Sequence, residues 1–206
     1  AYGLTPALVT AHLATATLFV GMLSYTTVGS FALAAPIQGP LDRETRLAWG
    51  AAAAAFAPIL VGGVVRGEGA GLAFSGWPLM DGRVIPPLGS FGAVLHFAHR
   101  LLAVAVGIVV VLLAVRLWPY RRTRTPAAIL AAAAVGLFFA QVLLGAANVW
   151  TKLAVAPVVG HVAVSSLLFG VLVAAAAASR ACACKERAAT HEVADRVPVA
   201  SSSVHA

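Results

Sequence analysis

Long apolar stretches, separated by shorter polar segments, make up most of this chain. Five of them approach or exceed the roughly 20 residues that a helix needs to cross a bilayer, and they cover residues 7–35, 47–65, 91–118, 127–150 and 158–179. Thr5-Pro6 provides a favourable helix start ahead of the first stretch. The pattern predicts an all-α integral membrane protein with five transmembrane helices.

The polar segments predict what connects these helices. Residues 66–90 are rich in Gly and Pro and too polar to span, so they predict a loop at the membrane interface, where Trp77 suits the boundary. The charged residues 42–46 predict a turn before the second helix. Residues 181–206 are charged and rich in Ser and Ala, which predicts a disordered tail.

Composition supports the membrane assignment and excludes other classes. Hydrophobic residues make up 61% of the 206 residues and charged residues only 10%, whereas a soluble domain carries about 25% charged residues. A globule of this size cannot bury that much apolar surface, which excludes an ordinary cytosolic enzyme and a disordered chain. The chain has two cysteines, Cys182 and Cys184, which exclude a disulfide framework, and we expect both to be reduced and inert.

The basic residues predict the orientation in the membrane. A net charge of +7 is compatible with nucleic-acid binding, but in a membrane protein basic residues mark the loops that stay in the cytoplasm. Ten Lys or Arg residues lie on one side, in 36–46, 116–126 and 180–206, against three on the other side, in 66–90 and at Lys152. We expect a multi-pass protein of the plasma membrane, with the N-terminus and the loop 66–90 outside, the tail in the cytoplasm, and no nucleic-acid partner.

Three histidines, His12, His99 and His161, lie near the outer ends of three helices that run in the same direction. A single histidine in a membrane helix is often a hydrogen-bond partner of a neighbouring helix. A group of them favours a site, because ionisable residues in the membrane are costly and neutral imidazole is a good axial ligand of haem iron. Zinc is disfavoured, since no third Cys, His or carboxylate ligand stands at a useful spacing.

His96 and Arg100 flank His99 on the same predicted helix. His96 precedes His99 by three residues and therefore shares a helix face with it. There it serves as an outer-sphere hydrogen-bond donor or a proton relay, or it only packs. Arg100 either extends its guanidinium to the interface or pairs with a haem propionate.

The first and last predicted helices contain similar segments. His12-Leu-Ala-Thr-Ala-Thr-Leu18 and His161-Val-Ala-Val-Ser-Ser-Leu167 share His, Ala and Leu at the same offsets, 149 positions apart. Parallel repeats of this kind occur in membrane proteins. The repeat predicts a complete four-helix unit in residues 37–180, preceded in residues 1–36 by the last helix of an incomplete unit.

Several motifs together resemble one known family. Val61–Leu72 is followed by Trp77-Pro-Leu-Met-Asp-Gly82, Ile85-Pro-Pro87 and His96-Phe-Ala-His99-Arg100, and later by Gln141-Val-Leu-Leu-Gly145 and His161. This order resembles the haem A synthase family of cytochrome oxidase assembly proteins over about residues 5–180. The resemblance implies two four-helix bundles related by a pseudo-twofold axis, of which residues 37–180 form the C-terminal, haem-binding one.

The resemblance also implies roles for the histidines. His99 and His161 correspond to the two ligands of a haem b iron, with Arg100 beside them, and His12 to the second histidine of a site for the substrate, haem O. In the family, the ring methyl group of haem O is oxidised to the formyl group of haem A. The family's catalytic glutamate and first substrate-site histidine have no counterpart here, and His96 holds the glutamate's equivalent position in the second half. The catalytic residues are therefore unassigned, and we expect the 206 residues alone to be inactive.

Other readings differ in what the chain does with haem. The missing glutamate favours a membrane b-type cytochrome, which transfers electrons without oxygenation, and a structural assembly protein without haem is a third class. Many bacterial relatives carry a cysteine ahead of the Trp-Pro, where this chain has Phe74-Ser75-Gly76, so no cysteine pair is expected in the outer loop. The partners implied are haem O, the lipid bilayer, and either a second copy of the chain or a haem O synthase.

Overall fold

Five long helices account for most of the chain in a computed structural model, which describes residues 5–32, 42–122 and 125–196. They are α1 (Pro6–Ala32), α2 (Asp42–Gly67), α3 (Phe91–Leu117), α4 (Pro126–Trp150) and α5 (Val155–Arg196), with short 3-10 helices η1 (Ala70–Leu72) and η2 (Trp118–Arg121). Within these ranges the one β-type pairing is an isolated bridge between Met80 and Arg83. All five helices are long and apolar enough to cross a membrane, which confirms the predicted all-α fold with five membrane helices.

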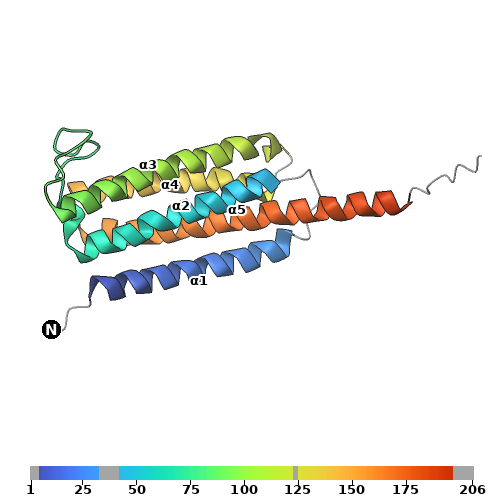
Figure 1. Cartoon of the computed structure of the whole chain (residues 1–206), viewed down its shortest axis with the longest axis horizontal. Coiled ribbons are helices and arrows are strands. Elements are labelled where there is room, and N and C mark those ends of the chain that lie inside the picture. The colour runs from blue at the N-terminus through green and yellow to red at the C-terminus, as the bar shows by residue number, and fades with distance from the viewer. Residues whose placement is uncertain (1–4, 33–41, 123–124, 197–206) are drawn as a thin grey trace, which may run out of the picture.

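Helices α2 to α5 form a four-helix ring, and α1 lies against its outside. Both α2 and α4 pack against α3 and α5, so that α3 and α5 face each other diagonally across the bundle. Helix α1 contacts α5 and α2, as the ribbon shows (Figure 1). The buried core combines large side chains with a run of alanines along α2, α4 and α5. Small residues of this kind let membrane helices approach closely.

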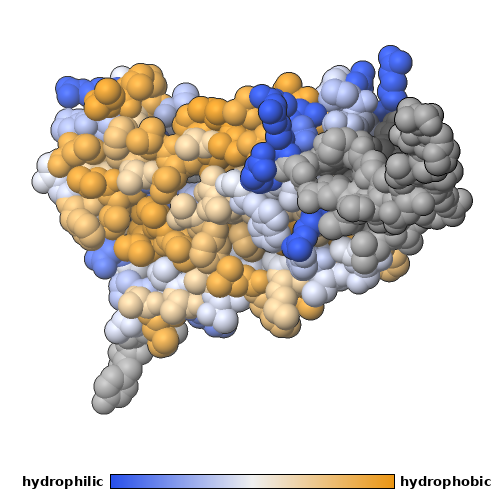
Figure 2. Space-filling model, turned by 45° about the vertical axis from the view of Figure 1, so that its right-hand side comes forward, coloured by the Kyte–Doolittle hydropathy of each residue, from blue (hydrophilic) through white to orange (hydrophobic). Residues whose placement is uncertain are grey.

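The surface of the bundle is apolar over most of its length. Figure 2 shows a broad hydrophobic face, with hydrophilic side chains gathered toward one end of the molecule. Large apolar side chains point outward from every helix, among them Phe19, Met22, Leu101, Phe139 and Val159. Such a surface is stable in hydrocarbon and not in water, so it fits a protein embedded in a bilayer.

Several predicted boundaries are wrong. Helix α2 runs from Asp42 to Gly67, so residues 42–46 are helical rather than a turn, and residues 66–67 are helical rather than part of the loop. Glu44 lies in the first helical turn, where an acidic side chain interacts favourably with the helix dipole.

Helix α5 continues to Arg196, so the part of the predicted disordered tail that covers 181–196 is helical. This segment is rich in Ala with Lys, Glu and Arg, which are strong helix formers. At about 1.5 Å per residue, a helix of 42 residues is about twice as long as a bilayer core is thick, so α5 extends well beyond the membrane. The last part of the tail, 197–206, lies outside the described residues.

The two segments of the sequence repeat pack against each other. Thr17 on α1 and Ser166 on α5 are equivalent in the repeat, and their hydroxyl oxygens lie 3.4 Å apart. The neighbouring contacts are reciprocal, because Gly21 faces Phe169 while its equivalent Gly170 faces Val20, the equivalent of Phe169. Equivalent residues that meet in this way indicate a local two-fold axis between α1 and α5.

Candidate functional site

Two histidines predicted as iron ligands meet across the bundle. His99 comes from the third turn of α3 and His161 from the second turn of α5, and their ring centroids are 6.4 Å apart with the planes inclined at 59°. Both helices begin at the same end of the bundle, which brings these early turns to the same depth. The structure thus joins two residues that are 62 positions apart in sequence.

The spacing of the two rings fits one shared metal ion. Two imidazoles that each hold a metal through nitrogen at about 2 Å place their ring centroids roughly 6 to 6.5 Å apart. The Nδ1 atoms of His99 and His161 are buried without a hydrogen-bond partner among the described residues, while each residue as a whole is only half-buried. The accessible part of each ring therefore lies away from Nδ1.

Two histidines alone make up this candidate ligand set. The described residues contain no group of three or more His, Cys, Asp and Glu side chains that could hold a metal ion. A planar macrocycle supplies four nitrogen ligands of its own and needs only two axial ligands from the protein, so the donor set suits a haem iron. The residues present therefore fit the group that the resemblance implies.

His96 and Arg100 bind the loop between α2 and α3. The side chain of Arg100 donates from Nε to Nε2 of His96 at 3.1 Å and from Nη2 to the carbonyl oxygen of Gly76 at 3.0 Å. Phe74 packs on the His96 ring at 5.4 Å between centroids and lies 6.0 Å from the guanidinium carbon of Arg100. We call these residues, together with Ser75 and Asp81, the loop latch. The remaining Arg100 nitrogen, Nη1, is buried without a partner among the described residues.

The loop also holds itself together beside Arg100. The hydroxyl and the backbone N–H of Ser75 donate to one carboxylate oxygen of Asp81, at 2.7 and 2.9 Å. These bonds lower the pKa of the Asp81 carboxyl below its ordinary value, and the bond from the Ser75 hydroxyl contributes most. Asp81 has a positive φ of 52°, a conformation that Asp adopts more readily than most residues. An ionised Asp81 is thus part of the loop's fold.

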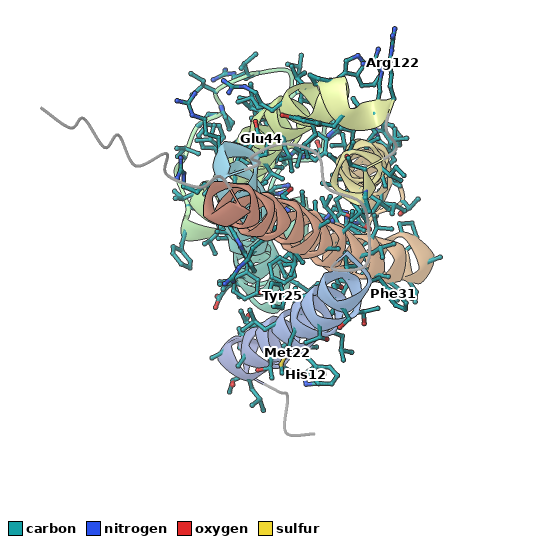
Figure 3. All side chains as sticks on the ribbon, turned by 90° about the vertical axis from the view of Figure 1, so that its right-hand side faces the viewer. His12, Met22, Tyr25, Phe31, Glu44 and Arg122 are labelled. Atoms are coloured by element: carbon teal, nitrogen blue, oxygen red, sulfur yellow. The ribbon has the colours of Figure 1, made fainter. Side chains whose placement is uncertain are left out.

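His12 does not join the other two histidines. It is exposed on α1, and Figure 3 shows it projecting, with Met22, from the side of α1 that faces away from the bundle. Tyr25 points toward the bundle instead, where its hydroxyl accepts a hydrogen bond from Arg180 at 3.2 Å. The predicted constellation of three histidines is therefore a pair, with His12 on a separate surface.

Sequence reasoning missed the glycines and the loop residues that surround the histidines. Gly62 on α2 and Gly145 on α4 contact the His99 and His161 rings, although both belong to motifs that carried the family resemblance. A glycine in a membrane helix at the depth of a histidine on a neighbouring helix is the signal that could have identified them. For Phe74 and Gly76 of the loop latch, the sequence offers no comparable signal.

Known proteins resemble this chain over most of its length. Residues 1–173 match the family model COX15-CtaA, described as cytochrome oxidase assembly protein. A heme A synthase of Symbiobacterium thermophilum is 45% identical over 102 residues, which cover 48% of this chain and 31% of that protein. A heme A synthase of Brucella ovis is 31% identical over 176 residues, covering 80% of this chain and 47% of that protein. The chain thus matches less than half of the length of these two relatives, 31% of one and 47% of the other.

Proposed function

The chain belongs to the cytochrome oxidase assembly protein family, and on this premise we propose that it acts in haem A biosynthesis, in the oxidation of haem O to haem A. Its bundle α2–α5 binds a haem b as cofactor between His99 and His161. The observation that carries this proposal is the 6.4 Å separation of the two imidazoles, each with a buried Nδ1 and its accessible side elsewhere.

The residues of the bundle have distinct tasks in this proposal. His99 and His161 would hold the haem iron through their imidazole nitrogens, while the apolar helices would exclude water from it. The Nη1 of Arg100, which has no partner among the described residues, would donate to a propionate once haem is bound, while Nε and Nη2 stay bound to His96 and Gly76. Once bound, a haem with two imidazole ligands transfers single electrons and offers no vacant position for oxygen.

Helix α1 contributes to a second site in this proposal. The reciprocal contacts between α1 and α5 support the assignment of residues 1–36 to a second bundle and of residues 37–180 to the bundle of α2–α5. His12 is then the equivalent of His161 and faces the substrate, haem O. Helices that complete this second bundle, from a longer chain or from a partner chain, would meet the exposed face of α1.

One observation favours a b-type cytochrome as the second candidate function. The imidazoles of His99 and His161, with ring centroids 6.4 Å apart, would together saturate an iron held between them, so the site in α2–α5 suits electron transfer. The two functions share the haem and differ only in whether haem O is converted. In both, the protein is a multi-pass protein of the plasma membrane, with the N-terminus and the loop 66–90 outside.

Haem analysis of the purified chain tests the proposal. We expect the protein, purified in detergent after reconstitution with haem, to hold about one haem b per chain by the pyridine haemochrome assay. His99→Ala and His161→Ala should each lose most of it, because one axial ligand is removed. Leu101→Ala and Val162→Ala are matched controls, since these neighbouring side chains are exposed to lipid. Haem retained by both histidine variants would overturn the site.

Conversion of haem O separates the two candidates. Membranes that contain the chain, alone or with a chain that completes the second bundle, are supplied with haem O, and haem A is measured by chromatography. Haem A that depends on His12 supports a role in haem A biosynthesis. Bound haem b without any haem A under both conditions supports the cytochrome.

A further inference from the structure

Each of the two facing histidines rests on a glycine of a neighbouring helix. A Cβ atom added to Gly62 on α2 would lie 3.0 Å from Cε1 and 3.4 Å from Nδ1 of His99. A Cβ atom added to Gly145 on α4 would lie 3.2 Å from Cε1 and 3.7 Å from Nδ1 of His161. The same edge of each ring therefore packs on a helix backbone, and the diagonal pair α2 and α4 supports the ligands of the diagonal pair α3 and α5.

The backbone carbonyl one turn before each glycine interacts with the same ring. The carbonyl of Pro58 lies near the His99 ring and that of Gln141 near the His161 ring, although neither forms a hydrogen bond with Nδ1. Pro58 and Gln141 precede Gly62 and Gly145 by four residues each. Because Cα–Cβ bonds tilt toward the N-terminus of a helix, a side chain at either glycine would stand beside that carbonyl. A glycine leaves the approach open.

We propose that Gly62 and Gly145 are positioning residues that seat the imidazoles of His99 and His161 against the backbone by their Nδ1–Cε1 edges and so turn both Nε2 atoms toward the space between the rings. The inference rests on the proposed haem site and deepens it. A ligand histidine commonly donates its second N–H to a carbonyl, which fixes the tautomer and the ring orientation. In this proposal, the backbone of α2 and of α4 fixes the tautomer and the orientation of the two rings.

An alanine at either glycine displaces the ring that it meets. Real Cβ atoms rarely approach a neighbour as closely as 3.0–3.2 Å, so each imidazole must move by a few tenths of an ångström. This movement carries Nδ1 away from the neighbouring backbone carbonyl. It also changes the distance between the Nε2 atom of His99 and the Nε2 atom of His161. Loss of such supporting contacts typically weakens metal binding by roughly ten- to a hundredfold.

The test compares alanine variants at four glycines of the same two helices. Gly62→Ala and Gly145→Ala fill the approach to the rings, whereas Gly50→Ala on α2 and Gly136→Ala on α4 are controls, because a Cβ there meets nothing within 4 Å. Alanine has a higher helix propensity than glycine, so all four variants are expected to fold, which circular dichroism verifies. Haem titration of the purified chains should show roughly ten- to a hundredfold weaker binding for the first pair only.

A second measurement works without haem. In the haem-free chain, nitrogen-15 NMR of labelled histidine should show His99 and His161 with the proton on Nδ1, and each alanine variant should shift its own histidine toward the other tautomer. Variants that bind haem like the controls and keep the Nδ1–H tautomer would overturn the positioning role. A third outcome separates the two proposals. If the wild type shows the Nδ1–H tautomer and the alanine variants lose it, but the wild type binds no haem, the proposed function is refuted and the positioning role stands.

Discussion

Arg100 donates from Nη2 to the backbone carbonyl oxygen of Gly76 at 3.0 Å. The bond ties the loop between α2 and α3 to the third turn of α3, directly beside His99. Since Nε of the same guanidinium binds His96 at 3.1 Å, one side chain fixes both the loop and the helix face beneath it. The loop latch thus holds the loop through hydrogen bonds and ring packing, at a segment where the sequence has Phe74-Ser75-Gly76 and no cysteine.

Arg100→Lys should loosen the loop. A lysine offers a single ammonium group in place of the planar fork and cannot hold Gly76 and His96 together. Loss of one charge-assisted hydrogen bond costs about 1.5–3 kcal/mol, so the open loop becomes roughly ten- to a hundredfold more populated. Limited proteolysis between residues 76 and 90 should accelerate accordingly. Arg83→Lys, an exposed change in the same loop, serves as the control, and equal cleavage of both variants would contradict the role of Arg100.

Acid should open the same loop through Asp81. Because the bonds from Ser75 lower the pKa of Asp81 in the folded state, the carboxylate stabilises the loop above its ordinary pKa, and that contribution is lost as the pH falls through the lowered value. Protection of the Ser75 amide from hydrogen exchange, corrected for intrinsic rates, should therefore fall below about pH 4. Asp81→Asn should remove this pH dependence. A variant that keeps it would assign the effect to another group.

Cross-linking tests the two-fold contact between α1 and α5. With Cys182 and Cys184 replaced by Ser, Thr17→Cys and Ser166→Cys together should form a disulfide in oxidised membranes, since the two hydroxyl oxygens lie 3.4 Å apart. The pair Thr15→Cys and Ser166→Cys is the control, because Thr15 is exposed on α1. Mass spectrometry of peptides detects the link. Equal cross-linking of both pairs would contradict the contact.

Labelling tests the predicted orientation. In the same cysteine-free background, Arg122→Cys, near the end of α3, should react with an impermeant maleimide only in inverted vesicles. Glu68→Cys, at the start of the outer loop, should react in intact cells. Both side chains are exposed, so a difference in labelling reports the side of the membrane and not burial in the protein. The reverse pattern would invert the topology.

The sequence predicts the helices well because hydrophobicity decides them. Five apolar stretches give five helices, since a backbone in hydrocarbon has to satisfy its own hydrogen bonds. The errors fall outside the apolar stretches, at Asp42–Arg46 and after Arg180, where hydrophobicity does not determine the secondary structure. In water, helix propensity and the dipole extend a helix beyond its apolar part.

The pairing of His99 with His161 could be predicted from the depth of each histidine in the membrane and the direction of its helix. The same reasoning failed for His12. His12 has the same depth on α1, but depth does not determine which way a side chain points. The rotation of α1 follows from its contacts through Thr17 and Gly21 with α5, which only the packing reveals. Gly62 and Gly145 stayed hidden for the same reason, because their role depends on which helices are neighbours.

The most direct test of the account is electron paramagnetic resonance of the ferric, haem-loaded chain. Two imidazoles on one iron predict a low-spin signal in the wild type, and His99→Ala and His161→Ala, each left with one ligand, should convert any haem that they retain to high spin. An unchanged low-spin signal in both variants would contradict the claim that His99 and His161 together hold the iron.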